Sequence, residues 1–140
     1  GATVVVTQMF FDVEIYGTFV AACIEYGITI PIIPGIMCIA SYGGFKRMIK
    51  FCKTRVAKEV SDRMEELKDE PAAIKLYGIE LGISMCKRLK QLGAPGYHFY
   101  TLNTSPVTVA ILQGLGHTKQ TPDTQNQTEP ATVFTAVTNA

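Results

Sequence analysis

The sequence predicts an α/β fold in which parallel strands alternate with helices, and three observations predict it. Short apolar runs rich in β-branched residues alternate with segments whose apolar residues recur every three or four positions, in the order β-α-β-α-α-α-β-α. Such alternation is typical of right-handed βαβ units. The chain has 140 residues, enough for one domain but fewer than the ~200 that a complete eight-stranded α/β barrel needs. Three strands alone would leave two bare sheet edges, so we expect part of the fold to be missing.

The first strand is expected over residues 3–11 (TVVVTQMFF), because a nearly continuous apolar run is typical of a parallel strand buried on both faces. Asp12 then offers a carboxylate that can cap a helix, and Gly27 suits the left-handed residue that ends one. The apolar stripe of this expected helix consists of Tyr16, Phe19, Val20 and Cys23.

A second strand is expected within residues 28–36 (ITIPIIPGI). It should be short, because proline cannot donate to a sheet ladder and Pro34 and Gly35 should turn the chain out of the sheet. The next two segments, residues 41–53 and 56–69, have helical spacing, with apolar side chains on one side and charged ones on the other. Two helices are therefore expected before a third and longer one.

The longest helix is expected over residues 71–93, with a proline in its first turn and a glycine at its end. Gly78 and Gly82 lie inside it, and each costs up to about 1 kcal/mol relative to alanine. That cost suggests that a neighbouring backbone packs closely there. A third strand is expected over residues 97–103 (YHFYTLN) and a final short helix over residues 107–115.

The composition changes after Gly116 to threonine, glutamine, asparagine and proline, which predicts a polar, disordered tail or linker over residues 117–140. A net charge of +1 provides no broad electrostatic footprint for nucleic acid, and every apolar run is far shorter than the ~18 residues of a membrane span. The sequence also lacks a glycine-rich nucleotide loop, a nucleophile elbow and a metalloprotease motif. We therefore expect neither nucleic acid nor a membrane as a partner.

The chain has four cysteines, Cys23, Cys38, Cys52 and Cys86. They form no C-x-x-C pair, so we expect small buried side chains rather than disulfides or metal ligands, in a reducing, cytoplasmic location. His98 and His117 do not complete a zinc site, and no metal is expected. The chain begins directly on a strand-like run without a visible signal or transit peptide, which suggests a piece of a longer protein.

Polar residues at the carboxyl ends of strands are the candidates for chemistry, because α/β barrels keep their active sites there. Gln8 ends a strand of valines, and its amide matches a heterocycle with amide-like edges; alternatively, it satisfies a backbone group at the strand end. In the third strand His98, Tyr100 and Leu102 share one face, opposite to that of Tyr97. His98 is either catalytic or a hydrogen-bonded core residue.

A basic cluster consists of Lys46, Arg47, Lys50, Lys53, Arg55 and Lys58. Such a cluster is usually a solvated helix face. The sharper alternative is that it lies near a bound polyanion.

Five segments, in this order and at these separations, resemble methylenetetrahydrofolate reductases: GATVVVTQMFFDVE, PIIPGIM, GFKRMIKFCKTRV, KDEPAAIKLYGIEL and YHFYTLN. The resemblance covers residues 1–116, and the second and third segments are most similar to eukaryotic members, including those of plants. It implies a flavoprotein with a (β/α)8 TIM barrel, of which this chain is the last three strand-helix units. Such enzymes use NADH or NADPH and FAD to reduce 5,10-methylenetetrahydrofolate to 5-methyltetrahydrofolate, in one-carbon metabolism and methionine biosynthesis.

The resemblance also implies site residues. Gln8 takes the position of the glutamine that hydrogen-bonds the pterin, and Tyr100 and Leu102 match positions that line the substrate. Met48 falls where a side chain packs over the nicotinamide and folate site. Thr104 stands where many members have an arginine that contributes to folate binding, which weakens one contact.

The family's general acid and most residues that hold FAD come from strands that this chain lacks. The resemblance therefore implies no catalytic residue here, and we expect the isolated piece to be inactive. We further expect Lys46, Arg47 and Lys50 to attract the polyglutamate tail of folate. The alternative function is a non-catalytic half-barrel that pairs its strand edges with another chain or a second copy. The choice between NADH and NADPH, a regulatory domain and homo-oligomerisation stay open.

Overall fold

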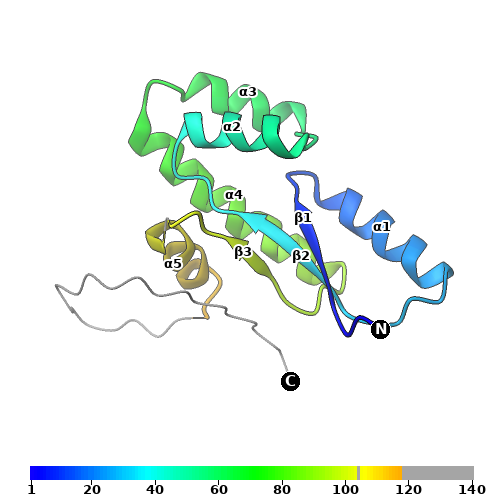
Figure 1. Ribbon diagram of the computed structural model, residues 1–140. Helices are drawn as coiled ribbons and strands as arrows, with labels where there is room; N and C mark the ends of the chain where they lie inside the picture. Colours follow the sequence, from blue (N-terminus) through cyan, green and yellow to red (C-terminus); the bar gives the residue numbers. More distant parts are fainter. Residues whose placement is uncertain (104, 118–140) are drawn as a thin grey trace.

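The structure is a computed structural model that describes residues 1–103 and 105–117. Its elements are β1 (Val5–Met9), α1 (Val13–Glu25), β2 (Ile32–Met37), α2 (Tyr42–Cys52), α3 (Lys58–Glu66), α4 (Pro71–Gln91), β3 (His98–Tyr100) and α5 (Ser105–Gly114). The described strands pair in parallel in the order β1-β2-β3, which confirms the α/β class and the predicted order of elements (Figure 1). Except for His117, the tail expected over residues 117–140 lies outside the described residues.

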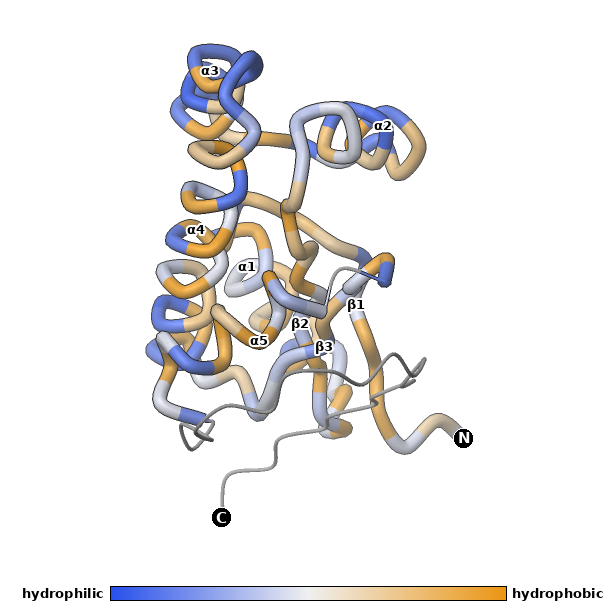
Figure 2. The backbone as a smooth tube through the Cα atoms, turned by 90° about the vertical axis from the view of Figure 1, so that its left-hand side faces the viewer, coloured by the Kyte–Doolittle hydropathy of each residue, from blue (hydrophilic) through white to orange (hydrophobic). Residues whose placement is uncertain are grey.

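Three of the described helices, α1, α4 and α5, cover one face of the sheet. In Figure 1 α4 passes behind the strands, and in the side view of Figure 2 α1, α4 and α5 all lie on the same side of the sheet. On this covered face, Ile36 of β2 and Leu89 of α4 have 0% exposure. On the opposite face, called here the open face, Val4 and Val6 are 46% and 45% exposed. The hydrophobic core therefore lies mainly between the sheet and α4.

The central strand, β2, is longer than its prolines suggested. The expectation that Pro34 and Gly35 turn the chain out of the sheet is wrong, because pairing with β3 continues through Met37. The Gly35 N–H is directed to Thr7 on β1 at 3.0 Å, so the neighbouring Pro34 nitrogen faces β3. Pairing with β3 begins only where Gly35 lies opposite His98, and the missing N–H of Pro34 therefore removes no ladder bond.

The first helix, α1, begins and ends as predicted. Asp12 accepts a hydrogen bond from the backbone N–H two residues on, at 3.2 Å, and Gly27 adopts a φ of 80° just after the helix. Tyr16 is buried and donates its hydroxyl to the Ile32 carbonyl oxygen at 2.8 Å, which holds α1 against β2. Phe19, which was expected in the apolar stripe, is instead 46% exposed because α1 lies at the edge of the fold (Figure 1).

The helices α2 and α3 lie beyond the carboxyl ends of the strands, at the top of both Figure 1 and Figure 2. Ser41 caps α2 by accepting the Gly44 N–H at 3.2 Å, and Lys53 ends the helix in the left-handed region with a φ of 50°. The Tyr42 hydroxyl donates to the Glu65 carboxylate and so joins the two helices. The connection from β2 to α4 therefore places two additional helices at the end of the sheet where α/β folds keep their sites.

The two glycines inside α4 permit two different close contacts. A Cβ atom on Gly78 would lie 2.4 Å from the backbone oxygen of Ile39, so this glycine admits a neighbouring backbone. A Cβ atom on Gly82 would lie 2.5 Å from the Cδ1 atom of Ile111, the far end of a side chain on α5. The expected close backbone is therefore confirmed at Gly78 and wrong at Gly82.

The cysteines are free thiols, and the expectation of small buried side chains is confirmed for three of them. Cys23, Cys38 and Cys86 are buried, whereas Cys52 is half-buried. Burial raises the pKa of Cys86 to about 12, so this thiol stays protonated at neutral pH. Within the described residues, no group of three or more His, Cys, Asp or Glu side chains could hold a metal ion. None of the described helices has the length and apolar character needed to cross a membrane.

Candidate functional site

A set of hydrogen bonds joins the three strands near their carboxyl ends, centred on Gly35. The Tyr100 hydroxyl of β3 donates to the Thr7 carbonyl oxygen of β1 at 3.0 Å, so its side chain crosses β2 at Gly35. Thr7 Oγ1 accepts the Gly35 N–H at 3.0 Å and donates to the Gln8 carbonyl oxygen at 2.9 Å. A Cβ atom on Gly35 would lie 2.6 Å from both the Thr7 oxygen and the Tyr100 ring. This arrangement, called here the Gly35 crossing, therefore requires glycine at its centre.

Gln8 lies directly beside the Gly35 crossing. The pairing of β1 with β2 is irregular there, because Val6 pairs with Ile33 but Met9 pairs with Gly35, which gives β1 one extra residue. Gln8 is exposed, and its Oε1 atom accepts the Met9 N–H at 3.0 Å. This is the strand-end backbone contact that was one of the two alternatives for Gln8. The exposed NH₂ group of the same amide can donate to a ligand with a carbonyl-like edge.

Tyr100 and His98 share the open face, as the alternation of side chains along a strand predicts. Their rings meet edge to face, with the ring centroids 4.6 Å apart. Tyr97 points the other way and donates its hydroxyl to the Cys86 carbonyl oxygen of α4 at 2.8 Å. Burial raises the pKa of Tyr97 to about 12. The described contact of His98 is thus an aromatic one with Tyr100.

Leu102 and Met48 come from two other segments. Leu102 follows β3, is 51% exposed and adopts a φ of 47°, and Asn103 after it adopts a φ of 63°. Consecutive left-handed residues other than glycine form an unfavourable turn of a kind that clusters at functional sites. Met48 is half-buried on α2 and packs against the hydrophobic core. The structure therefore brings Gln8 and Tyr100 together and places the other two on segments that flank the ends of the strands.

An open hollow of about 750 Å³ on α2 gathers part of the basic cluster. Its lining consists of Lys46, Arg47, Ile49, Lys50, Lys53 and Thr54. Arg55 and Lys58 lie outside this lining, and Lys58 pairs with Asp62 at 2.5 Å. The Thr54 hydroxyl is buried and has no hydrogen-bond partner among the described residues. The hollow thus combines four cations with one unsatisfied hydroxyl.

Three contributors to these sites, Thr7, Gly35 and Thr54, were missed from the sequence. A glycine inside an apolar strand is a signal for the close approach of a backbone or ligand, and it could have identified Gly35. Thr7 gave no such signal, because its contact with Gly35 depends on the irregular pairing of β1. Thr104, which replaces an expected arginine, lies outside the described residues.

Comparison with known proteins points to one family. The methylenetetrahydrofolate reductase family model matches residues 1–116. A Zea mays protein named methylenetetrahydrofolate reductase (NADH) 1 is 45% identical over 116 residues, which are 83% of this chain and 20% of that protein. A probable methylenetetrahydrofolate reductase (NADPH) of Caenorhabditis elegans is 43% identical over 117 residues, 83% of this chain and 18% of that protein. For the 5,10-methylenetetrahydrofolate reductase of Escherichia coli (strain K12), the identity is 34% over 116 residues, 83% of this chain and 39% of that protein. This chain therefore spans about a fifth of the length of its plant relative, 20%.

Proposed function

The chain belongs to the methylenetetrahydrofolate reductase family, and we propose that it forms part of the folate-binding wall of such an enzyme. In this proposal residues 1–116 are the last three strand-helix units of a (β/α)8 TIM barrel, and residues 117–140 are a polar tail or linker. The parallel order β1-β2-β3 with helices on one face supports it, because a barrel keeps its helices outside and the other face of its strands inside. The open face would then line the barrel interior. The complete barrel would reduce 5,10-methylenetetrahydrofolate to 5-methyltetrahydrofolate.

The observation that carries the proposal is the proximity of Gln8 and Tyr100 at the carboxyl end of the open face. Because a backbone N–H already occupies Oε1 of Gln8, its NH₂ group is left to donate to the pterin. The Tyr100 ring, fixed by the bond from its hydroxyl, supplies a rigid apolar wall beside that donor. Leu102 and Met48 would extend the apolar surface around the folate. These side chains bind and orient the substrate, and none is assigned a proton transfer.

The reductant is proposed to be NADH or NADPH, since the relatives are named for one or the other. FAD would carry the hydride from the nicotinamide to the folate. The glycines nearest a helix start, Gly43 and Gly44, do not fit the FAD diphosphate, because the Gly44 N–H already donates to Ser41 at 3.2 Å. FAD is therefore assigned to none of the described residues, and the chain alone is proposed to be inactive.

Replacement of Gln8 tests the folate assignment. Gln8→Glu keeps an oxygen that can accept the Met9 N–H but removes the NH₂ donor, so binding of 5-methyltetrahydrofolate should weaken about tenfold. The matched control Gln113→Glu makes the same exchange at an exposed position of α5 and should leave the affinity unchanged. Isothermal titration calorimetry measures the affinity, and circular dichroism checks the fold. Equal affinities of Gln8→Glu and the unaltered chain, or no folate binding by either, would contradict the proposal.

A second candidate function is a non-catalytic half-barrel that pairs with another chain or a second copy. The exposure of Val4 and Val6 on the open face favours it, because apolar surface and bare strand edges are where further chains add. Light scattering distinguishes the two functions. A self-paired half-barrel has at least twice the mass of one chain, whereas the folate-binding role requires no self-association.

A further inference from the structure

Every hydrogen bond of the Gly35 crossing passes through Thr7. The hydroxyl of this residue accepts the Gly35 N–H at 3.0 Å and donates to the Gln8 carbonyl oxygen at 2.9 Å. Its own carbonyl oxygen accepts the Tyr100 hydroxyl at 3.0 Å. The Thr7 side chain is half-buried, whereas Gln8 is exposed. Thr7 is therefore bonded to both residues that carry the proposed folate site, although it is itself less accessible than Gln8.

The Thr7 hydroxyl takes the place that a carbonyl oxygen fills in a regular ladder. Near the start of the strand pair, the Val5 N–H donates to the Pro31 carbonyl oxygen at 2.8 Å. Because the bonds of a parallel ladder repeat every two residues, a continuous register would direct the Gly35 N–H to the Thr7 carbonyl oxygen. In the structure this N–H bonds Thr7 Oγ1 instead, and the carbonyl oxygen accepts the Tyr100 hydroxyl.

One extra residue of β1 accompanies this exchange. A continuous register would place Gln8 opposite Gly35, whereas Met9 lies there in the structure. The bond from Thr7 Oγ1 to the Gln8 carbonyl oxygen lies within this irregular stretch, and Gln8 Oε1 accepts the Met9 N–H at 3.0 Å. An extra residue in a strand re-aims the side chains around it. The direction of the Gln8 amide therefore depends on the irregularity in which the Thr7 hydroxyl takes part.

We propose that Thr7 is a positioning residue of the folate site, which fixes Gln8 and Tyr100 relative to each other. The inference rests on the proposed function and adds to that site a residue that holds the other two. With the hydroxyl present, one oxygen atom of Thr7 bonds Gly35 and the other bonds Tyr100. Without the hydroxyl, both donors turn to the single carbonyl oxygen, and the ladder bond draws β1 toward the continuous register.

Two substitutions separate the hydroxyl of Thr7 from its shape. Thr7→Val keeps the branched side chain but removes the hydroxyl, so the 140-residue chain should bind 5-methyltetrahydrofolate about fivefold more weakly. Thr7→Ser keeps the hydroxyl and should bind within about twofold of the unaltered chain. The matched control Thr18→Val removes a hydroxyl that donates to the Glu14 carbonyl oxygen of α1 at 3.1 Å, and it should leave the affinity unchanged. Isothermal titration calorimetry measures the affinities, and circular dichroism checks that each variant folds.

Amide hydrogen exchange supplies a readout that a loss of stability alone would not give. The Met9 N–H reports on its bond to Gln8 Oε1, and the N–H of Leu89, a residue with 0% exposure, reports on opening of the core. Lower global stability speeds exchange at both positions, whereas release of the Gln8 amide speeds it at Met9 alone. In Thr7→Val we expect exchange about tenfold faster at Met9 relative to Leu89, and no such change in Thr7→Ser. Equal acceleration at the two positions would overturn the proposal.

A double variant tests whether Thr7 acts through Tyr100. Tyr100→Phe keeps the ring but removes the hydroxyl that bonds the Thr7 carbonyl oxygen. Thr7→Val combined with Tyr100→Phe should bind folate no more weakly than Thr7→Val alone, because both changes break one arrangement. Losses that multiply would show independent effects and overturn the proposal. The exchange at Met9 is measured without ligand, so failure of the folate assignment in Gln8→Glu is distinguishable from failure of this inference.

Discussion

The covered face of the sheet is packed by α4, whereas the open face carries exposed side chains of β1 and half-buried ones of β3. On the covered face Ile36 and Leu89 have 0% exposure, and their identity is fixed by the space between sheet and helix. On the open face Val6 is 45% exposed, and the Gly35 crossing gathers polar groups there. Under the proposed function, stability and folate binding are therefore served by opposite sides of the same strands.

Matched truncations on the two faces should show the largest difference. Leu89→Ala leaves a cavity in the core, so the free energy of unfolding should fall by about 2–5 kcal/mol. Val6→Ala removes methyl groups from a side chain that is already 45% exposed, so the free energy of unfolding should change by less than about 1 kcal/mol. Urea unfolding followed by circular dichroism measures both. A cost for Val6→Ala as large as that for Leu89→Ala would show that the open face is covered in solution and would break the comparison.

Alanine substitutions at Gly78 and Gly82 of α4 should show a smaller difference in stability, within the covered face. Alanine gains up to about 1 kcal/mol of helix propensity at either position. In Gly78→Ala the new Cβ meets the Ile39 backbone oxygen at 2.4 Å, and the required backbone shift should leave a net loss of about 1–3 kcal/mol.

In Gly82→Ala the new Cβ meets a side chain rather than a backbone, at 2.5 Å from Cδ1 and 3.0 Å from Cγ1 of Ile111, and a side chain can shift at lower cost than a backbone. The free energy of unfolding should therefore change by less than about 1 kcal/mol in either direction. The urea midpoints of the two variants, compared at equal slope, measure the difference. A loss at Gly82 equal to that at Gly78 would mean that α5 is as rigidly placed as the β2 to α2 connection.

The sequence predicted those features that depend on near neighbours in the chain. The order of elements and the Asp12 cap follow from local periodicity and local hydrogen bonding, and both are confirmed. The error at Pro34 has a non-local cause, because the effect of its missing N–H depends on where the adjacent strand begins to pair. The Gly35 crossing was also beyond local patterns, since Tyr100 and Thr7 are 93 residues apart. Gln8 could be identified as a candidate with a strand-end backbone group as one of two possible partners, but local patterns did not decide between the two.

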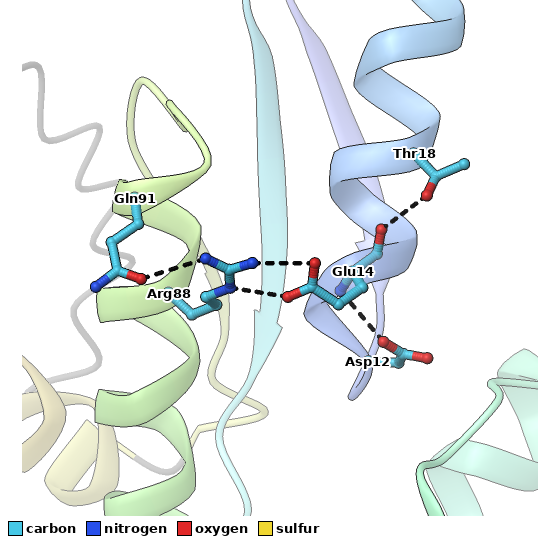
Figure 3. Close-up of polar contacts among 5 residues, drawn as sticks. All are labelled: Asp12, Glu14, Thr18, Arg88 and Gln91. Atoms are coloured by element: carbon cyan, nitrogen blue, oxygen red, sulfur yellow. Dashed lines mark hydrogen bonds and ion pairs between the residues drawn. The ribbon is translucent and has the colours of Figure 1, made fainter.

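The smallest effect is expected at the polar edge between α1 and α4. Arg88 Nε donates to Glu14 Oε1 at 2.8 Å, and Arg88 Nη2 donates to Glu14 Oε2 at 3.1 Å (Figure 3). A further guanidinium nitrogen of Arg88 donates to Gln91 Oε1 at 3.4 Å. The hydrogen bond from Arg88 lowers the pKa of Glu14, and because this carboxyl group is fully exposed, water and salt weaken the pair.

The free energy of unfolding should therefore rise with pH between the lowered pKa of Glu14 and its ordinary value of 4.5. In this window the unfolded chain binds more protons than the folded one, so the contribution is present above 4.5 and is lost as the pH falls through the folded pKa. Arg88→Gln should remove this rise. Glu65, whose pKa is lowered by the Tyr42 hydrogen bond, titrates in both proteins, so only the difference between their urea unfolding profiles reports on Glu14. That difference should shrink at about 1 M NaCl, where the screening length is about 3 Å. Parallel pH profiles of the two proteins at low salt would show that the Glu14–Arg88 pair contributes nothing to the free energy of unfolding.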